Sequence, residues 1–154
     1  MGMVKDRSQR SLTIGGNMGY KFEKLEVWTL ALEYADLIYR LTEKLPASEE
    51  YNLKSQIKRT ANSIALNIAE GSTSQTDAEQ ARFLSMAIRS LIETVACQHL
   101  INQRKYLTDP NILRQAYKES ETLFARLQAF RASLKGDRVH EETGGYDMGD
   151  ETPF

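Results

Sequence analysis

Side chains that could carry out catalysis are scarce in this sequence. Its 154 residues include two histidines, His99 and His140, and one cysteine, Cys97. Helical bundles that hold two metal ions use Glu-x-x-His pairs on facing helices, and no such pair occurs here. Cys97 and His99 are two positions apart, a spacing at which helical side chains do not face each other. We therefore predict that the protein is not an enzyme and binds no metal or cofactor.

Basic side chains are the other groups with a chemical use, because they suit phosphate binding. Lys54 and Lys58 are one helical turn apart, with Arg59 adjacent, and Arg114 and Lys118 repeat the spacing later in the chain. An oligomer would repeat such positions by symmetry and could hold RNA with them. The alternative for each charge is a role in solubility.

The charge is distributed unevenly along the chain, although the formal net charge is only −1. Residues 1–19 carry three basic side chains against one acidic, and residues 136–154 carry one against six. The segment 20–135 is therefore slightly basic, at +2, and the end of the chain is acidic. We expect the acidic end to compete with RNA for any basic patch.

Three segments follow from composition. Residues 1–19 and 136–154 are polar and glycine-containing without apolar periodicity, so we predict disordered tails around one domain at residues 20–135. A single cysteine rules out an intrachain disulfide, and we expect Cys97 to be a small buried hydrophobe. No apolar run approaches the roughly 18 residues of a membrane span, so we expect a cytoplasmic protein with no membrane partner.

Four apolar-periodic segments predict an all-α, up-down-up-down antiparallel four-helix bundle. The first helix is expected over residues 25–45 and ends before Pro46. Ser48 is the expected N-cap of the second helix, Thr76 of the third, and Thr108-Asp109-Pro110 marks the start of the fourth. The third helix should run to about residue 105 and the fourth to Lys135, with Gly136 as its stop.

The second helix carries the most unusual polar content. Its apolar face predicts a buried stripe of Leu53, Ile57, Ala61, Ile64 and Ile68. Asn67 falls at the edge of this face, so we predict that it is largely buried and hydrogen-bonded across helices. Glu70 lies on a neighbouring face, and Gly71 is expected to take the left-handed C′ conformation.

The third helix has a less clear pattern. Its predicted core stripe is Leu84, Ile88, Leu91, Val95 and either His99 or Asn102.

The first helix has more apolar surface than a bundle helix needs. One set of apolar residues is Val27, Ala31, Tyr34, Ile38, Leu41 and Leu45, and a second is Leu25, Trp28, Leu32, Ala35 and Tyr39. A bundle helix normally buries a stripe somewhat over 100° wide. The surplus predicts a subunit interface, and a deep central helix within a monomer is the alternative.

The same residues carry a family resemblance. The chain resembles the four-helix-bundle proteins encoded by intervening sequences in 23S ribosomal RNA genes over roughly residues 20–135. The matching positions are Phe22–Trp28, Leu45-Pro46, Leu53, Gln56, Arg59, Ala61, Ser63-Ile64, Asn67–Gly71, Arg82–Ala87 and Ser90–Glu93. Arg89 departs from the pattern, because the family usually has a small residue there.

The resemblance implies a fold and an assembly more than a chemistry. More distantly, the chain is similar to accessory variability proteins of diversity-generating retroelements, which form pentameric rings and serve reverse transcriptases. It thus implies a cyclic homo-oligomer, a pentamer, with RNA or a reverse transcriptase as partner. We expect a non-catalytic module that binds structured RNA or an RNA-handling protein. The alternative is a protein-interaction or regulatory bundle without nucleic acid.

Overall fold

The computed structural model describes residues 19–134 and 151–154. In chain order the elements are η1 (Lys21–Lys24), α2 (Glu26–Thr42), η2 (Ala47–Glu49), α3 (Leu53–Gly71), α4 (Asp77–Gln103) and α5 (Asn111–Leu134). The described residues contain no strand, which confirms the predicted all-α class. The predictions for residues 1–18 and 135–150 lie outside the described part of the chain.

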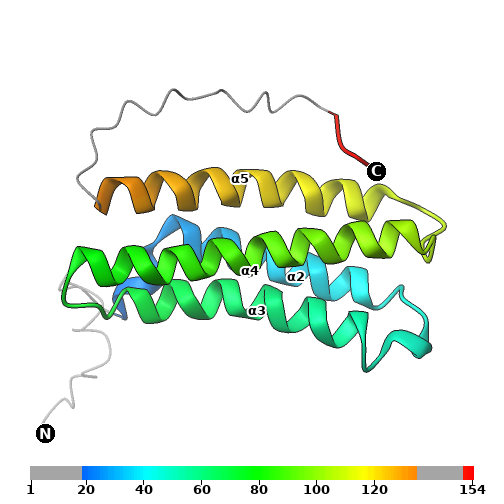
Figure 1. The fold of residues 1–154 in the computed structure, drawn as a ribbon, viewed down its shortest axis with the longest axis horizontal. Helices are drawn as coiled ribbons and strands as arrows, with labels where there is room; N and C mark the ends of the chain where they lie inside the picture. Colours follow the sequence, from blue (N-terminus) through cyan, green and yellow to red (C-terminus); the bar gives the residue numbers. More distant parts are fainter. Residues whose placement is uncertain (1–18, 135–150) are drawn as a thin grey trace, which may run out of the picture.

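The four α-helices lie side by side as a bundle (Figure 1). α3 packs between α2 and α4, and α5 packs between α4 and α2. The backbones of α2 and α4, and those of α3 and α5, do not approach each other within the described residues, so these pairs are the diagonals of the bundle. Short links join consecutive neighbours, which confirms the predicted up-down-up-down topology.

Two of the predicted capping positions are confirmed. Thr76 Oγ1 accepts a hydrogen bond from the backbone N–H of Glu79 at 3.2 Å and begins α4. Asp109 Oδ1 accepts from the N–H of Asn111 at 2.9 Å and begins α5. Each bond satisfies a backbone donor that has no partner within its own helix. These local signals fix where the long helices start.

The predicted start of the second helix at Ser48 is wrong. The chain first makes the separate turn η2, and α3 begins only at Leu53. The reason is Glu49, whose carboxylate accepts a hydrogen bond from the N–H of Leu53 at 3.2 Å. A glutamate four residues upstream therefore fills the role that we assigned to the serine.

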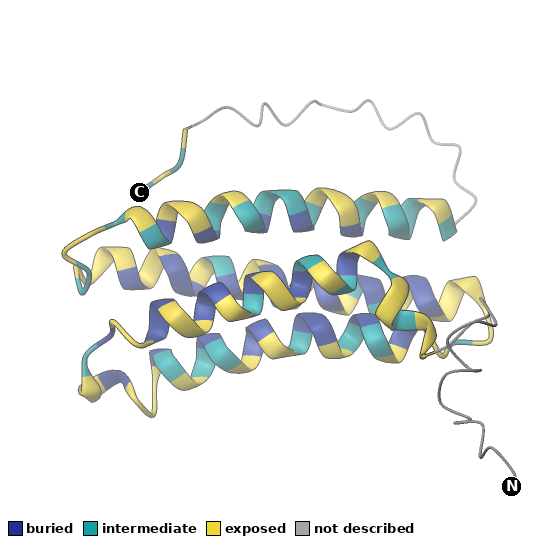
Figure 2. Cartoon of the chain, turned by 180° about the vertical axis from the view of Figure 1, so that it is seen from behind, coloured by how far each residue is buried: buried dark blue, intermediate teal, exposed yellow. Residues whose placement is uncertain are grey.

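The interior of the bundle is apolar and continuous. Figure 2 shows the buried residues on the sides of the helices that face one another. Among the largest fully buried side chains are Tyr34, Leu37, Ile57, Ile64, Leu84, Leu91 and Leu123. The predicted buried stripe of the second helix and the first apolar set of α2 are confirmed, and Cys97 is buried as expected.

The second apolar set of α2 is only partly covered. Leu25, Trp28 and Ala35 are half-buried, whereas Leu32 and Tyr39 are exposed. The surplus of apolar surface predicted from the sequence is therefore real, and Leu32 and Tyr39 are its exposed members.

The C-terminal half of the stripe predicted on α4 is wrong. Val95 is half-buried, and His99 and Asn102 are exposed. The buried positions are instead Thr94, Gln98 and Ile101, one residue earlier in each case. Polar side chains can face the core here because each has a hydrogen-bond partner on another helix.

Two pairs of hydrogen-bonded hydroxyl groups join α4 to α3. Thr94 Oγ1 donates to Thr60 Oγ1 on α3 at 2.9 Å. One turn earlier, the hydroxyls of Ser90 and Ser63 are also 2.9 Å apart. Both α3–α4 contacts use short side chains, so the two helix backbones can approach closely.

Gly71 has a different role from the one that we predicted. It is the last residue of α3, and Gly19 is the only described glycine with a positive φ. A Cβ atom at position 71 would lie 2.8 Å from the Cβ of Phe83 on α4. The glycine is therefore required by the close approach of two helices and not by left-handed backbone.

Replacing this glycine tests the close approach. Helix propensity alone predicts that Gly71→Ala stabilises the protein by about 1 kcal/mol. We expect instead a loss of about 1–3 kcal/mol, because the new methyl group overpacks the α3–α4 contact. Urea denaturation measures the difference. Phe83→Ala should not rescue the variant, since alanine keeps the Cβ atom that clashes. A Gly71→Ala protein as stable as the wild type would contradict the explanation.

A buried pair links α4 to α2. Gln98 Nε2 donates to the hydroxyl of Tyr34 at 2.6 Å, and both residues are fully buried. The Oε1 atom of Gln98 has no partner among the described residues. Burial also raises the pKa of Tyr34, so its hydroxyl stays protonated.

Removing one member of this pair should be costly. Tyr34→Phe leaves a buried amide without any partner, and we expect a loss of about 1–3 kcal/mol in unfolding free energy. The matched control is Tyr51→Phe, because Tyr51 is 97% exposed. The double variant Tyr34→Phe/Gln98→Leu should recover much of the loss, since no unpaired polar group remains. Equal stabilities for the two Tyr→Phe variants would refute the role of this bond.

Candidate functional site

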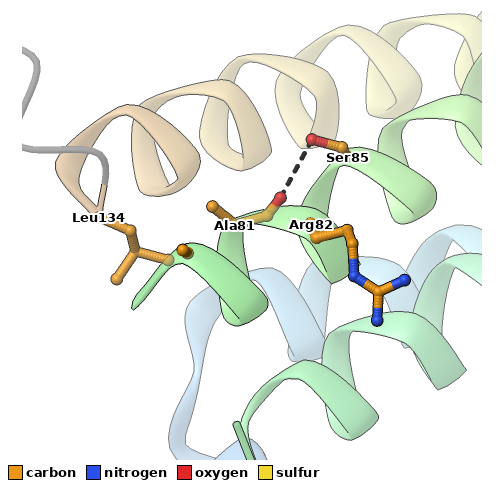
Figure 3. Close-up of a pocket in the computed structure, with 5 residues that line it drawn as sticks. Ala81, Arg82, Ser85 and Leu134 are labelled. Carbon is orange, nitrogen blue, oxygen red and sulfur yellow. Dashed lines mark hydrogen bonds between the residues drawn. The ribbon is translucent and has the colours of Figure 1, made fainter. Parts of the chain in front are cut away.

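Two surface pockets lie among the described residues, and the first offers little chemistry. It lies at the start of α4 beside the end of α5 and encloses about 380 Å³. Its lining is Ala78, Ala81, Arg82, Ser85 and Leu134. In Figure 3 the Arg82 guanidinium points away from Leu134, and Ser85 donates to the backbone oxygen of Ala81 at 3.0 Å. Among the described residues no acid–base pair converges there.

The second is a shallow, open depression along the outer face of α3. We call it the α3 groove. Its lining is Ser55, Lys58, Arg59, Asn62, Ser63, Leu66, Asn67 and Glu70. These positions recur every three or four residues, so a single helix face presents all of them. Two of the predicted RNA-binding residues, Lys58 and Arg59, therefore share one surface with Asn67 and Glu70.

Tyr39 of α2 contacts two residues that line the α3 groove. Its hydroxyl accepts a hydrogen bond from Asn62 Nδ2 at 2.7 Å. The ammonium group of Lys58 lies 5.3 Å from the centre of the Tyr39 ring, within range of a cation–π interaction. The tyrosine thus orients two groove residues. Our sequence reading placed Tyr39 only in an apolar set and missed this role.

Asn67 does not make the cross-helix bond that we predicted. It is half-buried, and its Nδ2 donates to the backbone oxygen of Ser63 at 2.8 Å and to the Ser63 hydroxyl at 3.1 Å. Both partners lie one turn earlier in the same helix. A short amide at a helix edge reaches the preceding turn more easily than a neighbouring helix. The contact across to α4 is made by Ser63 instead.

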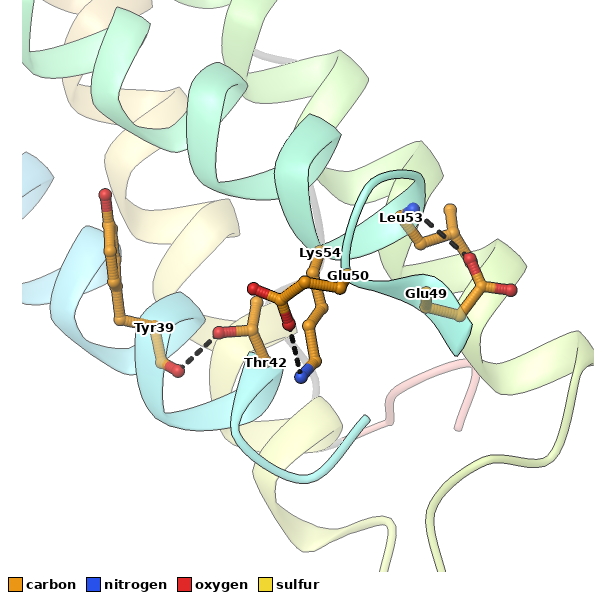
Figure 4. A network of polar contacts seen from close by, with 6 residues as sticks. All are labelled: Tyr39, Thr42, Glu49, Glu50, Leu53 and Lys54. Carbon is orange, nitrogen blue, oxygen red and sulfur yellow. Dashed lines mark hydrogen bonds and ion pairs between the residues drawn. The ribbon is translucent and has the colours of Figure 1, made fainter. Parts of the chain in front are cut away.

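The basic residues of α3 differ in their exposure and in their interactions with other side chains. Lys54 forms an ion pair with Glu50 at 3.0 Å, shown in Figure 4, and its side chain is only 15% exposed. Lys58 lies over Tyr39, and Arg59 is exposed. Within the described residues Arg59 has no hydrogen-bond or ion-pair partner. Lys58 and Arg59 are therefore the cations best placed to meet a ligand.

Arg114 and Lys118 do not join this surface. They lie on α5, which is diagonal to α3. The Nε of Arg114 donates to the main-chain oxygen of Phe154 at 2.8 Å. The five predicted RNA-binding positions therefore form two separate groups within one subunit.

Glu70 and Gly71 are the last two residues of α3. Glu70 is exposed and lines the far end of the groove, whereas Gly71 is buried against α4. Glu70 adds a negative charge to a surface that is otherwise basic or neutral. This charge separates the groove into a basic part near Lys58 and an acidic end.

A hydrogen-bond network holds the start of α3. Glu49 is 7% exposed, and its carboxylate accepts from the Tyr106 hydroxyl at 2.6 Å and from Asn52 Nδ2 at 2.9 Å. Figure 4 shows its further bond to the N–H of Leu53. These bonds, that of Tyr106 first, lower the pKa of Glu49. The network ties the start of the groove helix to the link between α4 and α5.

Catalytic groups do not assemble among the described residues. Burial raises the pKa of the Cys97 thiol, which opposes formation of the reactive thiolate. His99 contacts the rings of Tyr117 and Phe154. No group of three or more metal-ligating side chains is found in the described ranges. None of the described helices combines the length and apolarity that a bilayer crossing needs.

The end of the chain holds a contact that our sequence reading missed. Of the predicted tail over 136–154, residues 136–150 lie outside the described part of the chain, whereas residues 151–154 are described and Phe154 packs against the bundle core. A single aromatic residue in a polar segment has no periodicity, so pattern analysis could not identify it. The only feature of the sequence that sets Phe154 apart is the proline before it, Pro153.

Comparison with known proteins agrees with the resemblance to proteins encoded by 23S rRNA intervening sequences, while the more distant resemblance to accessory variability proteins stays a prediction. A family model described as 23S rRNA-intervening sequence protein matches residues 23–129. A solved structure from Bacteroides thetaiotaomicron, a protein of unknown function from the S23 ribosomal protein family, is 25% identical to this chain. The match covers 70% of this chain and 94% of that one, with a TM-score of 0.50. No curated protein matches the chain.

The Glu49 network predicts a dependence of stability on pH. Because the folded pKa of Glu49 lies below its unfolded value, its contribution is complete above the unfolded pKa, about 4.3. It is lost as the pH falls through the folded pKa. We expect Glu49→Gln to be less stable than the wild type at pH 7 and the difference to shrink below about pH 4.

Urea denaturation at a series of pH values from 7 to 3 measures this effect, with Glu43→Gln at an exposed position as the matched control. A difference between wild type and Glu49→Gln that stays constant over this range would argue against the carboxylate as its source.

Proposed function

The chain belongs to the 23S rRNA-intervening sequence protein family, and we propose that it is a non-catalytic, oligomeric bundle that binds structured RNA through the α3 groove. The observation that carries this proposal is the meeting of Lys58 and Arg59 with Asn62 and Asn67 on one helix face. Arginine, lysine and asparagine side chains commonly contact the phosphates and sugars of nucleic acids. The family's name, which refers to ribosomal RNA, supports RNA as the class of partner.

One groove alone has too few cations for tight binding. Each phosphate contact contributes about 0.7–0.9 to the salt dependence of binding, so two cations give a weak and salt-sensitive interaction. A symmetric oligomer presents the same groove several times to one RNA molecule. Arg114 and Lys118 would then extend the basic surface only if neighbouring subunits brought α5 near α3.

Exposed apolar side chains support the oligomer. Leu32 on α2 is 47% exposed, and Ile92 and Leu100 on α4 are 54% and 49% exposed. Ile92 and Leu100 are eight residues apart and so lie on one side of α4. We infer that these residues are covered by other copies of the chain. A ring of five, and a reverse transcriptase as partner, rest on the family resemblance alone and stay predictions.

A protein partner is the second candidate, and Leu66 is the observation that favours it. This leucine is 58% exposed and lies among the polar residues that line the α3 groove. An exposed apolar side chain surrounded by polar groups is typical of a protein contact. In this case the same groove would hold a helix or loop of another protein, and the basic residues would favour a partner with acidic side chains.

RNA binding by the groove can be tested with charge-neutral variants. We expect the wild type to bind a fluorescent RNA hairpin at low salt and to lose affinity as salt increases. Lys58→Gln/Arg59→Gln should weaken binding several-fold and reduce the salt slope by about 1.4–1.8, the contribution of two phosphate contacts. Fluorescence anisotropy at several salt concentrations measures both quantities.

The matched control is Arg82→Gln/Arg126→Gln, which removes two exposed charges outside the groove. Equal losses in both double variants would mean general electrostatic attraction and would reject the groove. Removal of residues 137–154, which carry six acidic side chains, should strengthen binding. If the wild type shows no binding at low salt, the RNA proposal fails and the protein-partner proposal replaces it. Light scattering on the same samples tests the oligomer, which a monomer at micromolar concentration would reject.

A further inference from the structure

Residues 151–154 lie on a defined surface of the bundle. This surface consists of His99 on α4 with Arg114 and Tyr117 on α5, and we call it the tail-binding surface. Figure 1 shows the described end of the chain beside the N-terminal part of α5, far along the helix from Leu134. A segment distant in sequence from Arg114 therefore returns to pack beside it.

The aromatic side chain of Phe154 makes two ring contacts on this surface. Its ring centre is 5.0 Å from that of His99 and 5.6 Å from that of Tyr117, with the Tyr117 ring perpendicular to it. His99 and Tyr117 are themselves in edge contact across the two helices, with ring centres 6.4 Å apart. Three rings from three segments thus form one cluster. Such edge-on arrangements are favoured over face-to-face stacking.

Polar contacts fix the main chain of the same residue. Arg114 Nε donates to the Phe154 main-chain oxygen at 2.8 Å, and Asn111 Oδ1 accepts from the same guanidinium at 3.3 Å. The Thr152 hydroxyl also donates to the Phe154 main-chain oxygen, at 3.3 Å. Pro153 restricts the backbone between them, so less conformational freedom is lost when the segment is held.

We propose that the tail-binding surface is a peptide-binding site for a short segment in which an aromatic residue follows a proline, with Glu151–Phe154 of this chain as its ligand. The rings of His99 and Tyr117 recognise the aromatic side chain, and Arg114 recognises the main-chain oxygen. A phosphate group cannot use the Nε of Arg114 while this segment is bound. The proposal does not depend on RNA binding by the α3 groove.

Occupancy of the site in solution can be read from the histidines. The chain has only two, His99 and His140, so its imidazole NMR spectrum is simple. The ring of Phe154 should shift the carbon-bound proton signals of His99. We expect full-length Phe154→Ala to lose this shift, while Tyr51→Ala, which removes an aromatic ring that is 97% exposed, leaves the His99 signals unchanged. Circular dichroism confirms that both variants are folded.

Recognition is then tested by adding peptides to full-length Phe154→Ala. The peptide Glu-Thr-Pro-Phe at millimolar concentration should return the His99 signals toward their wild-type positions, and Glu-Thr-Pro-Ala should not. Adding Tyr117→Ala to the same protein should weaken binding of the first peptide by roughly two- to tenfold. Two results would each overturn the proposal. One is identical His99 signals in the wild type and Phe154→Ala, and the other is equal effects of the two peptides.

Discussion

The close contact between α3 and α4 is the constraint on which the rest of the structure depends. Gly71 lets the end of α3 approach Phe83 closely. A Cβ atom at position 71 would lie 2.8 Å from the Cβ of Phe83. Farther along, paired hydroxyls join Thr60 to Thr94 and Ser63 to Ser90, each at 2.9 Å. Small side chains at all these points keep the helices close over much of their length. This contact fixes the rotation of α3 about its own axis and therefore decides which of its residues face outward.

The outward face of α3 follows from that rotation. Because Ile57, Ile64 and Ile68 are buried on the inner side of α3, the residues that line the groove lie on its outer side. Two neighbouring elements then complete the surface: Tyr39 of α2 orients Asn62 and Lys58, and Glu49 fixes the start of the helix. Ser63 takes part in both the α3–α4 contact and the groove. Its hydroxyl accepts a hydrogen bond from Ser90 on α4 and another from Asn67 in the groove. The groove is therefore coupled to the packing of the bundle.

Much of the fold could be predicted because its signals are local. The caps at Thr76 and Asp109 and the apolar periods of α2 and α3 lie within a few residues of the elements that they specify. Several of the errors concern residues whose position in the fold depends on a partner that is distant in the sequence. Hydropathy could not place Thr94 and Gln98 in the core, because their partners are on α3 and α2. Gly71 and Phe154 were misread or missed for the same reason, whereas Asn67 was expected to bond across helices and instead bonds Ser63 in its own helix. Of the predicted binding residues, sequence reasoning found Lys58 and Arg59 but could not know that α5 lies diagonal to α3.

The central claim is that α3 presents the functional surface, and mapping a bound ligand on the protein tests it most directly. An NMR titration of the full-length protein with a short RNA hairpin can follow the side-chain amide signals of Asn62 and Asn67 and the guanidinium signals of Arg59 and Arg114. Our account predicts that RNA shifts the signals of Asn62, Asn67 and Arg59 and leaves those of Arg114 near their free positions. Shifts centred on Arg114 with no change along α3 would contradict it.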